Sequence, residues 1–183
     1  MAHEERPPAP GALALVQRFV NSLDYPAGPD EFADPEAAAR WARGEGIAVG
    51  RELTGRDCAR LRRAREALRD LLETHGEDDS APCCQDFTAA LGTAPLEVRP
   101  VAGGWRIQPA GRGADAVLGA VAVALAEASI TGTWHRLKVC AADTCRFAFY
   151  DHSKNGRGTW CTMQICGARA KARAYRERRR AVP

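Results

Sequence analysis

The chain has 183 residues, enough for one medium-sized domain or for a larger domain with a small module attached. It is long enough for a real hydrophobic core, and its 45% apolar and 27% charged residues are ordinary for a soluble protein. The net charge of +3 hides an asymmetry, because residues 134–183 carry +9 and residues 1–133 carry −6. This division predicts an acidic body and a basic module with a polyanionic partner.

No segment has the pattern of a membrane span or a signal peptide. The longest apolar run, residues 116–130, is interrupted by Glu127 and is too short to cross a bilayer. The amino end, "MAHEERPPAPG", is acidic and proline-rich. We therefore expect a cytoplasmic protein that does not enter a membrane. In a reducing cytosol, its seven cysteines are expected to be free thiols or metal ligands rather than a disulfide scaffold.

Helical patterns predominate in the first part of the chain. Leu13, Val16 and Val20 recur at helical spacing and form one apolar stripe. Asp34 and Pro35 suit the N-cap and first turn of a second helix, "EAAARWARG".

A third helix is predicted to begin near Thr54 and Asp57, which have the spacing of a capping box, and to reach His75. One face of this helix is apolar and is expected to be buried: Leu61, Ala64, Leu68, Leu71 and Leu72. Cys58 on the same helix is interpreted as a packing residue. The segment "CCQDFTAALG" predicts another short helix, on which Cys83 and Cys84 are either a redox or metal pair or simply half-buried.

The period of the pattern changes between Leu96 and Pro109. The runs "LEVRPV" and "WRIQP" flank "AGG" and predict a β-hairpin, in which Pro100 and Pro109 are confined to edges or ends. The Ala-rich "ADAVLGAVAVALAEASI" then predicts a buried helix. The segment "TGTWHRLKV" leads to a cysteine-rich module, so we predict one domain over residues 1–133 and a second over residues 134–183.

The second domain contains two equally spaced cysteine pairs, Cys140-x4-Cys145 and Cys161-x4-Cys166, with 15 residues between them. This arrangement predicts a four-thiolate site for one structural Zn²⁺ per chain. Between the pairs, "RFAFY" and "TW" predict two strands joined by the turn in "DHSKNGRG". A helix follows, so we expect a treble-clef-like zinc module and an α+β fold with a mainly helical amino-terminal domain. Metal binding would contribute about 10–16 kcal/mol to folding of such a module.

Other chemistries remain open for the cysteines. Disulfides would require an oxidising compartment. A catalytic zinc ion would require an open coordination position, which four thiolates do not leave. His152 could replace one ligand, but it lies in the turn and is interpreted as a solvent-facing loop residue. No Cys, His and Asp set has a spacing that indicates nucleophilic catalysis, so we do not expect an enzyme.

These residues carry a resemblance to known families. Residues 136–180 resemble the CGNR zinc-finger family of bacterial proteins through the paired cysteines, the Trp-Cys step and the basic carboxy-terminal helix. The first domain resembles the ABATE domain, chiefly through "FVNSLD" and the order of its elements. The resemblance implies zinc at the four cysteines and a DNA-binding transcription regulator associated with stress responses. Ala168 replaces the signature asparagine, which removes a side chain able to contact nucleic acid but removes no zinc ligand.

Residues 165–180, taken as a helix, carry two stripes. An apolar stripe is predicted to lie on the hairpin and comprises Ile165, Ala168, Ala172 and Tyr175. The other stripe is cationic and consists of Arg169, Arg173, Arg176 and Arg180. Three neighbouring charges widen this candidate nucleic-acid-binding surface: Lys171, Arg178 and Arg179. Repulsion among these charges would be relieved by a phosphate backbone, where counterion release drives binding. The simplest alternative is a solvated tail.

Two functions are therefore carried forward. The first is a transcription regulator that binds double-stranded DNA. Its acidic domain would sense a small-molecule effector or form a homodimer. RNA stays open, because the module has aromatic residues that could stack on bases, although they also suit its core: Phe147, Phe149, Tyr150 and Trp160. The alternative is a ligand-binding or protein-interaction protein with purely structural zinc, whose basic helix pairs with an acidic protein surface, including its own first domain.

Overall fold

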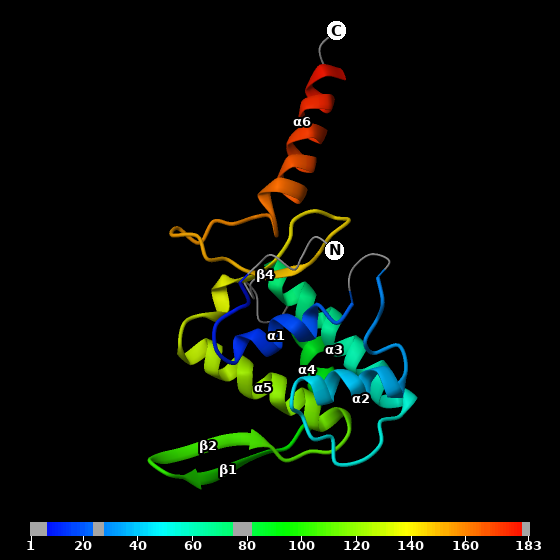
Figure 1. Cartoon of the computed structure of the whole chain (residues 1–183), viewed down its shortest axis with the longest axis vertical. Coiled ribbons are helices and arrows are strands. Elements are labelled where there is room, and N and C mark those ends of the chain that lie inside the picture. Colours follow the sequence, from blue (N-terminus) through cyan, green and yellow to red (C-terminus); the bar gives the residue numbers. More distant parts are fainter. Residues whose placement is uncertain (1–6, 24–27, 75–81, 181–183) are drawn as a thin grey trace.

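The computed structural model describes residues 7–23, 28–74 and 82–180. A helical body carries a small antiparallel sheet at each end, and the last helix projects beyond one of them (Figure 1). This confirms the predicted α+β class. The elements in chain order are α1 (Leu13–Val20), α2 (Pro35–Gly44), α3 (Gly55–Thr74), α4 (Pro82–Leu91), β1 (Leu96–Val101), β2 (Gly104–Pro109), α5 (Ala114–Ile130), η1 (Trp134–Arg136), β3 (Leu137–Val139), β4 (Ala148–Tyr150), η2 (Met163–Gly167) and α6 (Ala168–Arg180).

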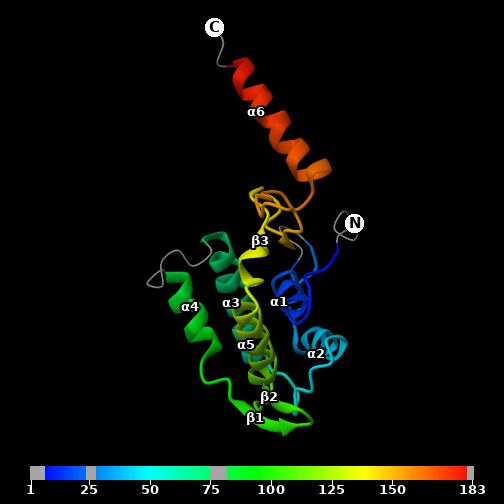
Figure 2. The same ribbon diagram turned by 90° about the vertical axis from the view of Figure 1, so that its left-hand side faces the viewer.

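The core of the body lies between α1, α3 and α5, with α2 packed on α3 and α4 packed on α3 and α5 (Figure 2). The predicted apolar stripe of α1 is buried, and so are four of the five residues predicted for α3, the fifth (Leu71) being half-buried. His75 lies outside the described residues. No helix in the described part of the chain has the length and apolarity needed to traverse a bilayer.

Side-chain caps explain where two helices begin. The Asp34 carboxylate accepts a hydrogen bond from the backbone N–H of Ala37 at 2.8 Å, which starts α2. At α3, the backbone N–H of Thr54 donates to Asp57 at 2.8 Å, and the N–H of Asp57 donates back to the Thr54 hydroxyl at 3.3 Å. This is the predicted capping box.

Asp57 also joins α3 to α5. Its carboxylate accepts two hydrogen bonds from the Arg51 guanidinium, at 2.8 and 2.7 Å, and one from the backbone N–H of Ala114 at 3.1 Å. The hydrogen bonds from Arg51, followed by those from Thr54 and Ala114, hold the pKa of Asp57 well below its ordinary value despite its burial. The carboxylate is therefore charged in the folded chain and contributes to stability.

The hairpin β3–β4 forms a wall between two cores. Side chains alternate between the faces of a strand. Leu137 and Ala148 are fully buried in the core of the helical body, whereas Phe149 lies in a second, smaller core with the four predicted cysteine ligands. Tyr150, the next residue, packs against the body again. Of the module's aromatic residues, Phe147 and Trp160 accompany Phe149 in the small core.

The prediction of a strand at "TW", residues 159–160, is wrong. Residues 159–160 form no strand, and β4 pairs instead with β3, so that residues 140–147 are the turn of the hairpin. The backbone at residue 159 touches this turn through one hydrogen bond, from the N–H of Ala141 to the carbonyl of Thr159 at 3.1 Å. On its other edge β4 meets a side chain instead of a strand, because Asn21 pairs with both the backbone N–H and the carbonyl of Ala148.

The other hairpin, β1–β2, is formed as predicted, with Val98 opposite Ile107. It lies at the opposite end of the molecule from α6 and extends past the body (Figure 1). Its turn places Gly103 at φ +85°, a conformation that favours glycine.

Asp57→Asn should lower the free energy of unfolding by about 2 kcal/mol at pH 7, because charge-assisted hydrogen bonds are lost. The folded-state pKa is depressed, so this contribution is present above the unfolded pKa of about 3.9 and disappears as the pH falls below it. The difference between the variant and the wild type should therefore shrink at pH 3 in urea denaturation. Glu36→Gln, which removes an exposed pair with Arg40, is the control and should cost at most about 0.5 kcal/mol. Equal losses for both variants would contradict the assignment.

Candidate metal centre and its arginine helix

Two segments supply the cysteines of the candidate centre. Cys140 directly follows β3, and Cys145 lies farther along the same hairpin turn, where the N–H of Cys140 donates to the carbonyl of Phe147 at 3.0 Å. Cys161 follows the long loop after β4, and Cys166 lies in the π-helical turn η2. The hairpin turn thus supplies one pair, and residues 161–167, which end in η2, supply the other.

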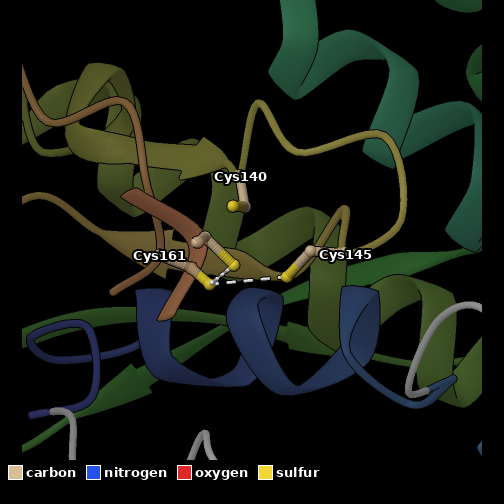
Figure 3. Close-up of side chains that lie close together, drawn as sticks. Cys140, Cys145 and Cys161 are labelled. Atoms are coloured by element: carbon tan, nitrogen blue, oxygen red, sulfur yellow. Dashed lines mark hydrogen bonds between the residues drawn. The ribbon is translucent and has the colours of Figure 1, made fainter. Parts of the chain in front are cut away.

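The geometry of the four thiols fits a single metal ion. Their Sγ atoms all lie within 4.8 Å of one another, and all four residues are buried. The Sγ atoms of Cys145 and Cys161 are 3.4 Å apart, and those of Cys161 and Cys166 are 3.6 Å apart. Figure 3 shows the side chains of Cys140, Cys145 and Cys161 close together. A tetrahedron with Zn–S bonds of about 2.3 Å has sulfur–sulfur edges of about 3.8 Å. The four cysteines can therefore hold one zinc ion.

Electrostatics also favour a cation at this point. Hydrogen bonds from the thiols of Cys145 and Cys161 lower the pKa of Cys140, so one thiolate forms readily in the cluster. The hydrogen bond with Cys140 and burial then raise the pKa of Cys161, because a second negative charge at this distance is repelled. A divalent cation removes that conflict and allows all four sulfurs to be thiolates.

The shell around the sulfurs is apolar and tight. Phe147, Trp160 and Ile165 pack against the cysteine cluster. A Cβ atom on Gly167 would lie 2.5 Å from Sδ of Met163 and 3.3 Å from the Trp160 ring, so a larger residue would require the exposed Met163 side chain to move. The glycine after the last cysteine therefore lets the Met163 side chain pack against the backbone of η2 beside Trp160.

The loop between the cysteine pairs is organised by Asp151, which is buried. Its carboxylate accepts hydrogen bonds from Lys138 Nζ at 2.9 Å, from the N–H of Ser153 at 3.0 Å and from the N–H of Gly158 at 2.6 Å. Burial alone would raise the pKa of Asp151, but these bonds lower it below its ordinary value. His152, weighed as a substitute ligand, is exposed in this loop and lies outside the thiol cluster.

The seven predicted nucleic-acid-binding residues all lie on α6, and all are exposed. The arginines near its beginning face a hollow of about 240 Å³ between the helix and the cysteine turn, lined by Arg169, Arg173 and Arg176 together with residues 142–144 and Trp160. Arg173 Nη1 lies 3.7 Å from Asp143 Oδ2. Farther along, the Arg179 guanidinium lies 5.9 Å from the ring centre of Tyr175.

The prediction that α6 lies on the hairpin is wrong. No residue of α6 is buried, Ala168 and Ala172 are exposed, and Tyr175 is 56% exposed. Only Ile165, which belongs to η2, packs against the cysteine core. The helix is therefore fixed at its first turn and extends freely from the body (Figures 1 and 2). Burying a few alanine side chains gains little free energy, and the many charges favour exposure to water.

The remaining cysteines play no part in the cluster. Cys58 is buried in α3, and burial raises the pKa of its thiol, which is the expected behaviour of a packing residue. Cys83 and Cys84 are half-buried on α4, away from the other thiols.

Sequence reasoning missed the residues that attach the centre to the body. The Asn21 side chain pairs with the backbone of Ala148 in both directions: Ala148 N–H donates to Oδ1 and Nδ2 donates to the Ala148 carbonyl, each at 2.8 Å. Arg146, beside the ligand position Cys145, makes ion pairs with Asp70 at 2.6 Å and with Glu73 at 2.8 Å on α3. Asn21 lies within "FVNSLD", so the sequence did hold a signal for it.

Comparison with protein-family models gave two matches. The ABATE model, described as "Putative stress-induced transcription regulator", matches residues 11–132, about two thirds of the chain. The model of the CGNR zinc finger matches residues 136–179. A search of curated proteins found no match. The resemblance drawn from the sequence is thereby confirmed.

Purified protein should contain about one zinc ion per chain, measured by plasma emission spectrometry. Replacement of Cys161 and Cys166 by serine should abolish zinc binding, because two of four thiolates are lost. The matched control replaces Cys83 and Cys84 by serine and should retain the metal. Zinc in the first variant at wild-type stoichiometry would contradict the assignment of the centre.

Proposed function

This chain belongs to the ABATE family and ends in a CGNR zinc finger, and on that premise we propose that it is a zinc-containing, DNA-binding transcription regulator. We also propose that the protein is cytoplasmic and has no enzymatic activity. The observation that carries it is the arrangement of α6, an exposed arginine-rich helix that is held at its first turn beside the cysteine centre and, at Arg173, by an ion pair with Asp143.

Charge and shape both suit α6 to duplex DNA. The helix carries seven Lys or Arg residues and one acid, Glu177. Its 13 residues span about 20 Å, and an α-helix fits the major groove of B-DNA, which is about 12 Å wide. Arginine is the residue best suited to bidentate contacts with phosphate and guanine. Projection from the body leaves room for the duplex around the helix (Figure 1).

The hollow beside the first turns of α6 supports different roles for the two ends of the helix in DNA binding. Arg169, Arg173 and Arg176 converge there with the cysteine turn, and a phosphate group placed in it would meet three guanidinium groups. We assign this end of the helix to the DNA backbone, and the free end to the groove. Ala168 is exposed at the start of the helix, so the asparagine of the family signature would have added a polar side chain there.

The alternative function requires α6 to pair with an acidic protein surface. Its intramolecular form gains no support from the arrangement of the described residues, because α6 points away from the acidic body and Arg173 meets Asp143 of its own module. Pairing with an acidic surface of another protein remains the alternative to DNA.

A small-molecule effector is a further part of the proposal. A hollow of about 640 Å³ between α3 and the cysteine turn is a suitable position for it, since a ligand there would touch both family domains.

Replacing Arg169, Arg173 and Arg176 by alanine should weaken binding to duplex DNA and flatten its salt dependence. Each lost phosphate contact reduces the slope of log K against log salt by about 0.9, so the slope should fall by about 2.7. Fluorescence anisotropy with a mixed-sequence duplex over a range of salt measures both effects.

The control is a variant with the same change in charge on the body, in which the exposed Arg43, Arg56 and Arg63 become alanine. Its salt slope should stay at the wild-type value. Wild-type protein that binds no duplex at low salt, or equal slopes for the two triple variants, would refute the DNA proposal.

A further inference from the structure

The helix α5 is largely apolar, with Asp115 and Glu127 as its two charged residues, although one of its sides faces solvent. Val117, Leu118 and Val121 are fully buried in the body. On the outer side, Val123 is only half-buried and Ile130 is 87% exposed. Helices that are apolar all round are normally covered all round. Figure 2 views the molecule toward this side, where α5 runs along the surface.

The hairpin β1–β2 continues this surface as a projecting arm. Its register places six residues on one face, all of them apolar: Leu96, Val98, Pro100, Trp105, Ile107 and Pro109. At the foot of the arm this face meets α5, since a Cβ atom on Gly119 would lie 3.1 Å from Pro109 and 3.4 Å from Leu96. Toward the tip it is uncovered, with Val98 61% exposed and Trp105 74% exposed. We call the apolar face of the arm and the outer side of α5 the arm surface.

The arm surface is large enough to be an interface. From their exposed fractions, the side chains of Leu96, Val98, Trp105 and Ile107 present roughly 450 Å² of accessible area, toward the upper end for apolar patches on monomeric proteins. Two such patches, together with the outer sides of two α5 helices, reach the total of about 1,000–1,200 Å² that a specific interface buries.

A projection and a recess lie at the same end of the molecule. Beside the foot of the arm is a hollow of about 280 Å³, whose lining is mostly small or apolar and also includes one amide: Gly46, Ile47, Ala48, Gln108, Pro109, Gly111, Ala116 and Ala120. Trp105 stands near the tip of the arm. A surface with a projection and a matching recess is complementary to a copy of itself related by two-fold symmetry.

We propose that the arm surface binds a second copy of this chain, with Trp105 of each copy entering the hollow at the foot of the partner's arm. A lipid surface is disfavoured by the negative charge of the body, which anionic headgroups repel. The arm lies at the opposite end from α6, so the association leaves both basic helices exposed (Figure 1).

Sedimentation velocity on the full chain, without DNA, tests this proposal. The wild type should show a monomer–dimer equilibrium that strengthens with salt, because an apolar contact joins two bodies of like charge. Trp105→Ala should weaken dimerisation at least tenfold, and Ile107→Arg should abolish it, since it buries a charge in the apolar face. The controls are Arg106→Ala, on the polar face of the arm, and Tyr175→Ala, an exposed aromatic residue on α6, and neither should change the equilibrium.

Quenching of tryptophan fluorescence by acrylamide gives an independent measurement on the unchanged protein. The contribution of Trp105, obtained as the difference between wild type and Trp105→Phe, should become less accessible as protein concentration rises. A wild type that stays monomeric at its highest soluble concentration, or controls that weaken the dimer as much as Trp105→Ala does, would overturn the proposal. So would binding of a monomeric chain to vesicles of anionic phospholipid that depends on Trp105.

Discussion

The orientation of the basic helix depends on one interaction, the gathering of four buried cysteine sulfurs around a common point. Beyond η2, no residue of α6 is buried, so no side-chain packing along its length determines where it points. Four thiolates repel one another at these distances, and a divalent cation is what allows them to share the site. Zinc would therefore act as the structural equivalent of a hydrophobic core for the module, fixing Cys166 and with it the first turn of the helix.

This centre is in turn fixed to the helical body through the hairpin β3–β4. Leu137 and Ala148 belong to the core of the body, while Phe149 belongs to the cysteine core, so the two cores share one wall. Arg146 strengthens the junction, and its φ of +46° is strained for a residue with a side chain. Its ion pairs with α3 help to hold this conformation beside Cys145. A change in the position of α3 would consequently be transmitted to the metal centre.

The sequence allows prediction of those features whose signals are local or evenly spaced. Thr54 and Asp57 define the start of α3, and the repeated spacing of the cysteines defines the cluster. The pairing of β4 could not be predicted, because its three residues are held partly by Asn21, which lies 127 residues away from Ala148. The exposure of α6 could not be predicted either. A helical stripe that consists largely of alanine has the right period but too little apolar area to hold a charged helix against a surface.

The fold converts an uneven distribution of charge along the sequence into a molecule with two different ends. The carboxy-terminal module carries +9 and the body −6, and α6 extends from the end opposite the arm. A polyanion attracts one end and repels the other, so diffusional encounters with DNA would favour approach with α6 leading. The apolar arm then remains on the side remote from the polyanion. Contact with nucleic acid and assembly with a second copy, as proposed, would therefore use opposite ends of the molecule, and neither would need to displace the other.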